Sequence, residues 1–154
     1  MDTYDAGNAA RSNFLEGYNC SQSVYMALAP LMGKDRLSAA RTAAFLGGGV
    51  CRTRNICGAV LGMLMACGDA DGNTTGEDQD AKGRNYAEGQ ELMEQFCRRF
   101  GSLQCRELLG IDPAVKEDSH PEARTEEYYR KRPCPGIIEY AARLGQEYIA
   151  DKTR

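Results

Sequence analysis

The sequence has no tryptophan and a single histidine, His120, among its 154 residues. One histidine cannot build a multi-histidine metal site or a relay between two histidines. Long apolar runs are also absent, because the longest extends only from residue 56 to residue 67 and contains two glycines. A membrane span needs about 20 apolar residues. We therefore expect no transmembrane helix and no partnership with a membrane.

Charge of one sign is not abundant either. The 19 basic and 22 acidic side chains give a formal net charge of −3. A nucleic-acid-binding protein needs a basic surface, so we expect no nucleic acid partner. The first five residues, 1–5, are polar and acidic, without the basic start and apolar stretch of a secretory signal. We therefore expect a cytoplasmic protein in a reducing compartment.

Cysteine, in contrast, is plentiful, yet no two cysteines form a Cys-x-x-Cys motif. That absence excludes the thioredoxin-type dithiol, the c-type haem attachment and the usual zinc knuckle. In a reducing compartment we do not expect a disulfide framework. Any site that cysteines share must be assembled by the fold from distant segments. The seven are Cys20, Cys51, Cys57, Cys67, Cys97, Cys105 and Cys134.

Apolar residues recur at helical spacing along the chain, and no segment alternates as a strand would. A length of 154 residues with 42% hydrophobic residues suits one domain with a real core. We predict an all-α protein, residues 1–154 forming a single compact bundle of five to seven helices. The main helical segments are 3–17, 20–33, 57–67, 80–100 and 135–151, with shorter ones at 38–46 and 102–109 and a further candidate at 122–131.

Two of these segments should pack closely together. Residues 57–67 are almost wholly apolar, and Gly58 and Gly62 lie four apart on one face, where another backbone could approach. The amphipathic segment 80–100 should cover this helix with an inward face. Alternatively, apolar surface left uncovered on 57–67 would favour a homodimer. The residues that we expect to point inward are Tyr86, Met93, Phe96, Cys97 and Phe100.

Four cysteines fall at the predicted N-termini of helices: Cys20, Cys57, Cys105 and Cys134. Asn19 should cap the helix of Cys20, Asn55 the next one, and Cys134 itself the last. Unpaired N–H groups and the positive end of the helix dipole favour a thiolate there, which is the form that attacks disulfides and binds metals. Of the other three cysteines, Cys67 and Cys97 are expected to pack in the core and Cys51 to lie in a loop.

The same four cysteines carry a resemblance to a known family. Five segments resemble the C_GCAxxG_C_C family of redox-active proteins, in the same order, over about residues 10–145. The chain reads Cys-Gly-Ala where the family name reads Gly-Cys-Ala. The resemblance implies a helical redox protein whose family cysteines are Cys20, Cys57, Cys105 and Cys134. The segments are 19–24, 47–49, 57–62, 105–110 and 134–135.

Three functions remain open. The first is electron transfer or redox sensing by an iron–sulfur or similar metal centre ligated by the four cysteines, with Arg52, Arg54 and Arg106 offsetting its charge. The second is metal-free thiol–disulfide exchange between pairs of the same cysteines, with a redox partner that the sequence does not name. The third is a helical scaffold in which cysteines only fill the core. Both redox functions require the four cysteines to converge.

Overall fold

Helices make up the regular structure of the protein, a computed structural model that describes residues 3–153. Within those residues the all-α prediction is confirmed, since there is no strand beyond one isolated bridge between Ile56 and Gln104. The predicted number of helices was too low: setting aside α4, a distorted turn, eight α-helices remain instead of five to seven. The excess comes from short helices such as α7 and α8. The elements are α1 (Ala6–Leu15), α2 (Cys20–Leu28), η1 (Ala29–Met32), α3 (Arg36–Ala43), η2 (Ala44–Leu46), α4 (Gly47–Val50), α5 (Gly58–Asp71), α6 (Gln79–Phe100), α7 (Cys105–Leu109), α8 (Glu126–Lys131) and α9 (Cys134–Lys152).

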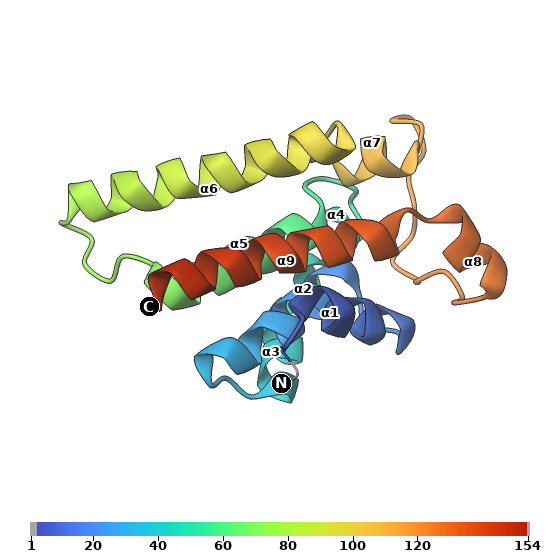
Figure 1. The fold of residues 1–154 in the computed structure, drawn as a ribbon. Helices are drawn as coiled ribbons and strands as arrows, with labels where there is room; N and C mark the ends of the chain where they lie inside the picture. Colours follow the sequence, from blue (N-terminus) through green and yellow to red (C-terminus); the bar gives the residue numbers. More distant parts are fainter. Residues whose placement is uncertain (1–2, 154) are drawn as a thin grey trace.

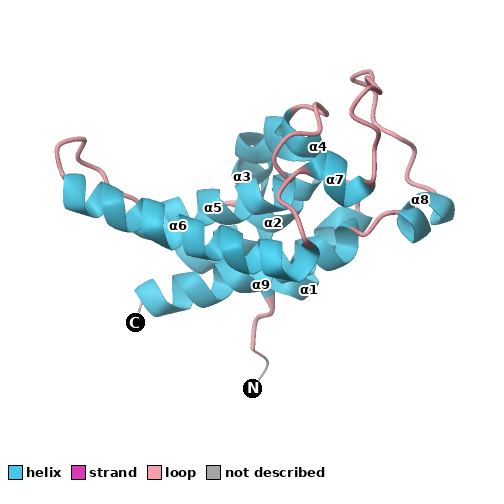
Figure 2. Cartoon of the chain, turned by 90° about the horizontal axis from the view of Figure 1, so that it is seen from above, coloured by secondary structure: helices cyan, strands magenta, loops and turns pink. Residues whose placement is uncertain are grey.

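Helix α5 lies at the centre of the fold. Helices α2 and α9 pack against it, and α1 packs on both of them. Figure 1 shows α9 running along α5, with α6 extended beside this pair. Figure 2 shows the long loop between α7 and α8 standing out from the helices. No helix within residues 3–153 has the length and apolar character that a membrane crossing requires. The largest fully buried apolar side chains are Phe14, Val24, Met26, Leu28, Val60, Met63, Phe96 and Ile138.

Glycines let α5 and α2 approach to backbone contact, as the sequence predicts. A Cβ built on Gly62 would lie 2.7 Å from the Ser21 carbonyl oxygen, and one on Gly58 would lie 3.1 Å from the Ser21 amide nitrogen. Backbone atoms cannot move aside as a flexible side chain can. The close pairing of α2 with α5, which sets where Cys20 and Cys57 begin their helices, therefore depends on these glycines.

We expect Gly62→Ala to lower the free energy of unfolding by about 1–3 kcal/mol, because the added methyl overpacks against the α2 backbone. Gly68→Ala is the matched control, since Gly68 lies in the same helix with nothing within 4 Å of the added Cβ. That control should be neutral or stabilising by up to about 1 kcal/mol, the helix propensity difference. Urea unfolding of both variants measures the contrast, and equal effects would contradict it.

Helix α6 covers the core with only part of its length. Leu92 and Phe96 are buried, and Phe96 packs on Phe100 with ring centroids 4.9 Å apart. The prediction that Tyr86 points inward was wrong, because its side chain is 66% exposed. No residue of the N-terminal half of α6 is buried, so amphipathic spacing there does not correspond to a covered face.

The helix starts follow the predicted capping with two exceptions. Asn19 caps α2 through a complete capping box with Gln22. Asn55 was predicted to cap α5, but the N-cap of α5 is Cys57. Asn55 lies two residues before that cap, and its backbone carbonyl oxygen accepts a hydrogen bond from the Cys105 amide. Cys134 is the first residue of α9, with Pro133 as its N-cap, rather than the cap itself.

Candidate functional site

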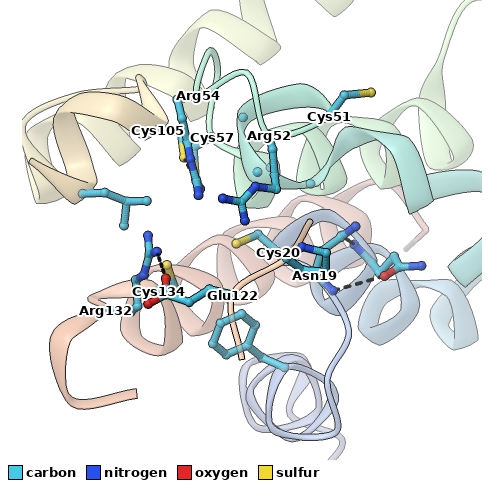
Figure 3. Close-up of a pocket in the computed structure, with 18 of the residues that line it drawn as sticks. Asn19, Cys20, Cys51, Arg52, Arg54, Cys57, Cys105, Glu122, Arg132 and Cys134 are labelled. Atoms are coloured by element: carbon cyan, nitrogen blue, oxygen red, sulfur yellow. Dashed lines mark hydrogen bonds and ion pairs between the residues drawn. The ribbon is translucent and has the colours of Figure 1, made fainter. Parts of the chain in front are cut away.

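Cys20, Cys57, Cys105 and Cys134 line one pocket of about 700 Å³ (Figure 3). Each lies at a helix N-terminus: three are the first residues of α2, α7 and α9, and Cys57 is the N-cap of α5. The predicted convergence of the four cysteines is confirmed. Four helix starts therefore point toward a common space, and each favours negative charge on its sulfur.

Cys57 and Cys105 are brought together by a short backbone pairing. The Cys57 amide donates to the Leu103 carbonyl oxygen at 2.8 Å, and the Cys105 amide donates to the Asn55 carbonyl oxygen at 2.7 Å. These bonds flank the antiparallel bridge between Ile56 and Gln104. Each cysteine thus lies one residue beyond the bridge, where its own helix begins, and the two enter the pocket from the same side (Figure 3).

Cys20 and Cys134 form the second pair. Their side chains interact across the starts of α2 and α9, which pack against each other. The interaction joins two residues that are far apart in the sequence.

The four thiols differ in acidity. The interaction with Cys20, assisted by the charges of Arg132, Arg54 and Arg124, lowers the pKa of Cys134 below that of an ordinary thiol. The same interaction, together with burial, raises the pKa of Cys20. Cys134 is the thiolate of this pair because the arginines act on it, and Cys20 is the thiol.

The second pair stays protonated at neutral pH. Burial raises the pKa of Cys57 to about 12, beyond what the backbone N–H groups of α5 offset. Burial also raises the pKa of Cys105, although the Arg54 guanidinium, 3.6 Å from the Cys105 sulfur, opposes that rise. Of the four sulfurs, Cys134 alone is therefore shifted toward the reactive form.

Arginines surround the cysteines. Arg54 is 8% exposed and is paired with Glu117 as well as with Cys105. Arg132, two residues before the start of α9, forms an ion pair with Glu122. Arg124 donates to the Phe14 carbonyl oxygen at 2.8 Å and lies over the Phe14 ring.

A left-handed turn delivers two of these arginines to the pocket. Residues 48–52 all have positive φ, from Gly48 at 65° to Arg52 at 61°, and Arg54 is also at 61°. A left-handed conformation costs about 1–2 kcal/mol for each residue with a Cβ. Backbone hydrogen bonds stabilise the turn. The Asn55 amide donates to the Gly49 carbonyl oxygen at 2.7 Å, and the Arg54 amide donates to the Gly48 carbonyl oxygen at 3.0 Å. The turn begins in the glycine run at residues 47–49 and continues through the non-glycine residues Val50, Cys51 and Arg52.

The remaining cysteines lie away from the four. Cys51 is exposed at the rim of the pocket, its thiol donates to the Phe45 carbonyl oxygen, and Figure 3 shows its sulfur pointing outward. Cys67 is buried on α5 and lines a separate cavity of about 490 Å³. Cys97 is half-buried on α6 and does not line the pocket of the four. The sequence placed all three outside the site.

Several pocket residues were missed because they come from the segment between α7 and α9. Arg124, Arg132 and Glu122 line the pocket, although residues 111–121 and their continuation read as an irregular connector and a short helix. Arg106 was expected near the sulfurs, but it lies outside the pocket lining and donates to the carbonyls of Asp112 and Val115. The only sequence signal for Arg132 is its place two residues before Cys134.

A single metal ion needs several ligand side chains close together. Across residues 3–153, no three histidine, cysteine, aspartate or glutamate side chains are grouped closely enough to hold one. The four thiols nevertheless surround a space larger than one ion. The arrangement thus offers one interacting thiol pair and, with the second pair, four sulfur donors around a pocket.

Comparison with known proteins gives one match. A family model described as "Putative redox-active protein (C_GCAxxG_C_C)" matches residues 18–148, which include all four converging cysteines. No curated protein and no solved structure matches the chain. The match covers most of the sequence and agrees with the resemblance carried by the cysteine segments. The chain therefore belongs to the C_GCAxxG_C_C family, whose description is that of a redox-active protein.

Proposed function

We propose that the protein is a thiol–disulfide redox protein in which Cys134 is the attacking thiolate and Cys20 the resolving thiol. The observation that carries this proposal is that Cys20 and Cys134 line one pocket at the starts of two packed helices, with the pKa of Cys134 lowered and that of Cys20 raised. A lowered pKa increases the fraction of thiolate at a given pH, and a neighbouring thiol can complete the exchange.

The reaction needs a disulfide as the oxidant. The Cys134 thiolate attacks one sulfur of a partner disulfide, which forms a mixed disulfide and releases a partner thiolate. Cys20 then attacks the Cys134 sulfur, its proton passes to a departing thiolate, and the second partner sulfur leaves. The partner gains two electrons and becomes a thiol and a thiolate, while Cys20 and Cys134 lose two electrons and form a disulfide. Exchange in the opposite direction reduces the protein again.

The test is to treat the fully reduced protein with one equivalent of a small disulfide and to map the product by mass spectrometry. We expect a disulfide between Cys20 and Cys134, and the loss of two thiols for each equivalent. A protein oxidised at random positions, or one in which alkylation of all thiols changes only stability, would instead support a helical scaffold.

The pH dependence of alkylation follows from the pKa directions. An ordinary cysteine titrates at about 8.5, and the pKa of Cys134 lies below the ordinary value. Its thiolate therefore persists to lower pH and is lost only as the pH falls through the lowered pKa. We expect the rate of iodoacetamide modification at Cys134 to reach half its maximum at a lower pH than for a free cysteine derivative in solution, as followed by mass spectrometry.

Cys20→Ala provides the control for that profile. The variant removes the interacting thiol, so the half-maximal pH of Cys134 should move upward toward the ordinary value. Cys57, whose pKa is raised to about 12, should remain nearly unmodified across the same range. A half-maximal pH for Cys134 in the wild-type protein at or above that of the free cysteine derivative would contradict its assignment as the thiolate.

We propose an iron–sulfur centre as a second candidate. Its support is the convergence of four thiols from four helix N-termini, with arginines beside them, in a pocket of about 700 Å³. A cluster separates its ligands more than a single ion does, and the surrounding positive charge would offset its negative charge. When bound, a cluster supplies one-electron transfer. Anaerobic purification with iron and sulfide analysis tests this candidate: a colourless, iron-free protein that also fails reconstitution would exclude it.

We also propose that the chain forms a homodimer through the N-terminal half of α6, in which no residue is buried. The support is Tyr86, exposed beside a cavity lined by Leu64 and Met93. Light scattering at micromolar concentration tests this association, and Tyr86→Arg should weaken it. A monomeric wild-type protein would end the proposal.

We place the protein in the cytoplasm, because a reducing compartment keeps a resting dithiol reduced.

A further inference from the structure

One pocket arginine has a guanidinium that the structure leaves incompletely paired. Within residues 3–153, Arg52 makes one ion pair, 3.4 Å from its Nη2 to Glu117 Oε1. Its Nε is buried and has no hydrogen-bond partner. Arg52 points into the pocket close to Cys20 in Figure 3. A buried donor without an acceptor is unfavourable unless a ligand supplies one.

The other pocket arginines are already occupied. Arg54 is held by Glu117 and Cys105, and Arg132 is held by Glu122. Arg124 donates to three backbone carbonyl oxygens at the end of α1 and in the α1–α2 connection. Among these described pocket arginines, Arg52 is therefore the one with a buried donor atom that lacks an acceptor.

The fold holds Arg52 in place at a cost. Its backbone is left-handed, and its Cγ lies so near Gly48 that a Cβ there would be 2.9 Å away. Its side chain is 20% exposed. Strained residues that persist in a pocket mark positions where the side chain has a function.

The rest of the pocket is apolar and suits a small molecule. Its volume is about 700 Å³, within the range of small-molecule sites. Apolar side chains form part of the pocket wall. They are Phe14, Leu108, Leu109, Tyr128 and Ile137.

We propose that the pocket binds a small disulfide that carries a carboxylate, and that Arg52 selects it by pairing with that carboxylate. The apolar part of the ligand lies against the wall, and its disulfide faces Cys134. The proposal rests on the thiol–disulfide function and names the substrate class of the same site. Exchange then proceeds as described above, with the small disulfide taking up the two electrons.

The test compares two small aromatic disulfides with the reduced protein. Dithiobis(nitrobenzoate) carries carboxylates, whereas dithiodipyridine is uncharged at neutral pH. Both release a coloured thiol, so stopped-flow absorbance gives a second-order rate constant for each. The ratio of the anionic to the neutral rate constant measures charge recognition, because changes in the reactivity of the Cys134 thiolate alter both constants together.

We expect Arg52→Gln to lower that ratio by about tenfold or more, the effect of losing a hydrogen bond between charged groups. Arg52→Lys keeps the charge without the forked donors and should give an intermediate ratio. Arg98→Gln is the matched control, because Arg98 is 64% exposed on α6 and does not line the pocket. Its ratio should equal that of the wild-type protein.

Each outcome decides one question. A ratio in Arg52→Gln that equals the wild-type ratio overturns the selection of a carboxylate by Arg52. A wild-type protein that reacts with neither disulfide at Cys134 overturns the thiol–disulfide function itself. An unfolded Arg52→Gln protein would expose all its thiols and would be recognised by the loss of its helical circular dichroism. The Arg52→Lys ratio then decides, and a ratio there equal to that of the wild-type protein overturns the proposal.

Discussion

Cys134→Ser is expected to lower the rate of reaction with a small disulfide at neutral pH by at least about a hundredfold, to the level of the other thiols. The serine hydroxyl cannot act as a thiolate, and the other three cysteines of the site have raised pKa values. Stopped-flow measurement of thiol release, with mass spectrometry to locate the modified cysteine, gives the result.

Two further variants separate a chemical effect from a structural one. Cys20→Ser keeps the attacking sulfur but removes the resolving one, so the mixed disulfide at Cys134 should accumulate rather than disappear. Cys97→Ser lies outside the pocket and should leave the rate unchanged. A Cys134→Ser protein that still reacts rapidly would show that a different cysteine is the nucleophile.

Arg54→Met is expected to lower the free energy of unfolding by about 3 kcal/mol or more. Arg54 is 8% exposed and pairs with Glu117, and removing one partner of a buried ion pair typically costs about 3–5 kcal/mol. The lower end is expected because Glu117 keeps 20% exposure and some hydration. Urea unfolding at neutral pH measures the loss.

The double variant Arg54→Met/Glu117→Gln tests the cause of that loss. Removing the carboxylate charge as well should recover only part of the stability, because the carboxylate that lost Arg54 is then neutral, whereas Arg52 loses its own ion pair with Glu117. Arg11→Met is the matched surface control. Arg11 is 48% exposed, and its Nη1 lies 3.2 Å from Glu139 Oε2. Losing this ion pair should lower the free energy of unfolding by less than about 1 kcal/mol. A loss from Arg54→Met no larger than from Arg11→Met would mean that the buried pair has no structural role.

Local chemistry was sufficient to predict most of the helix starts and which four cysteines lie at them. Capping depends on a few neighbouring residues, so Asn19 could be recognised as the cap of α2 from the sequence alone. The same locality placed Cys20, Cys57, Cys105 and Cys134 at helix starts, and Cys67 and Cys97 within helices. The spacing of Gly58 and Gly62 likewise predicted the close approach of another backbone, because a missing Cβ is a property of the residue itself.

Tertiary contacts decided which cysteines meet and how their acidity differs. The pairing of Cys57 with Cys105 depends on backbone hydrogen bonds between residues 54–57 and 103–106, and that of Cys20 with Cys134 on the packing of α2 against α9. A helix start alone favours a thiolate at every one of the four. At Cys57 and Cys105 burial overrides that preference, and at Cys20 the interaction with Cys134 raises the thiol pKa together with burial.

The arginines show the same division between local and distant interactions. Sequence proximity indicated Arg52 and Arg54 but also Arg106, which lies outside the pocket, and it did not indicate Arg124. Nor could it indicate that the turn at residues 48–52 is left-handed, because Val50, Cys51 and Arg52 all disfavour that conformation. The sequence by itself determined the helices, their starts and the candidate cysteines, since these depend on short-range bonding. The pocket, its charge and its single lowered thiol pKa were decided by tertiary structure, since burial and charge pairing exist only once distant segments have packed together.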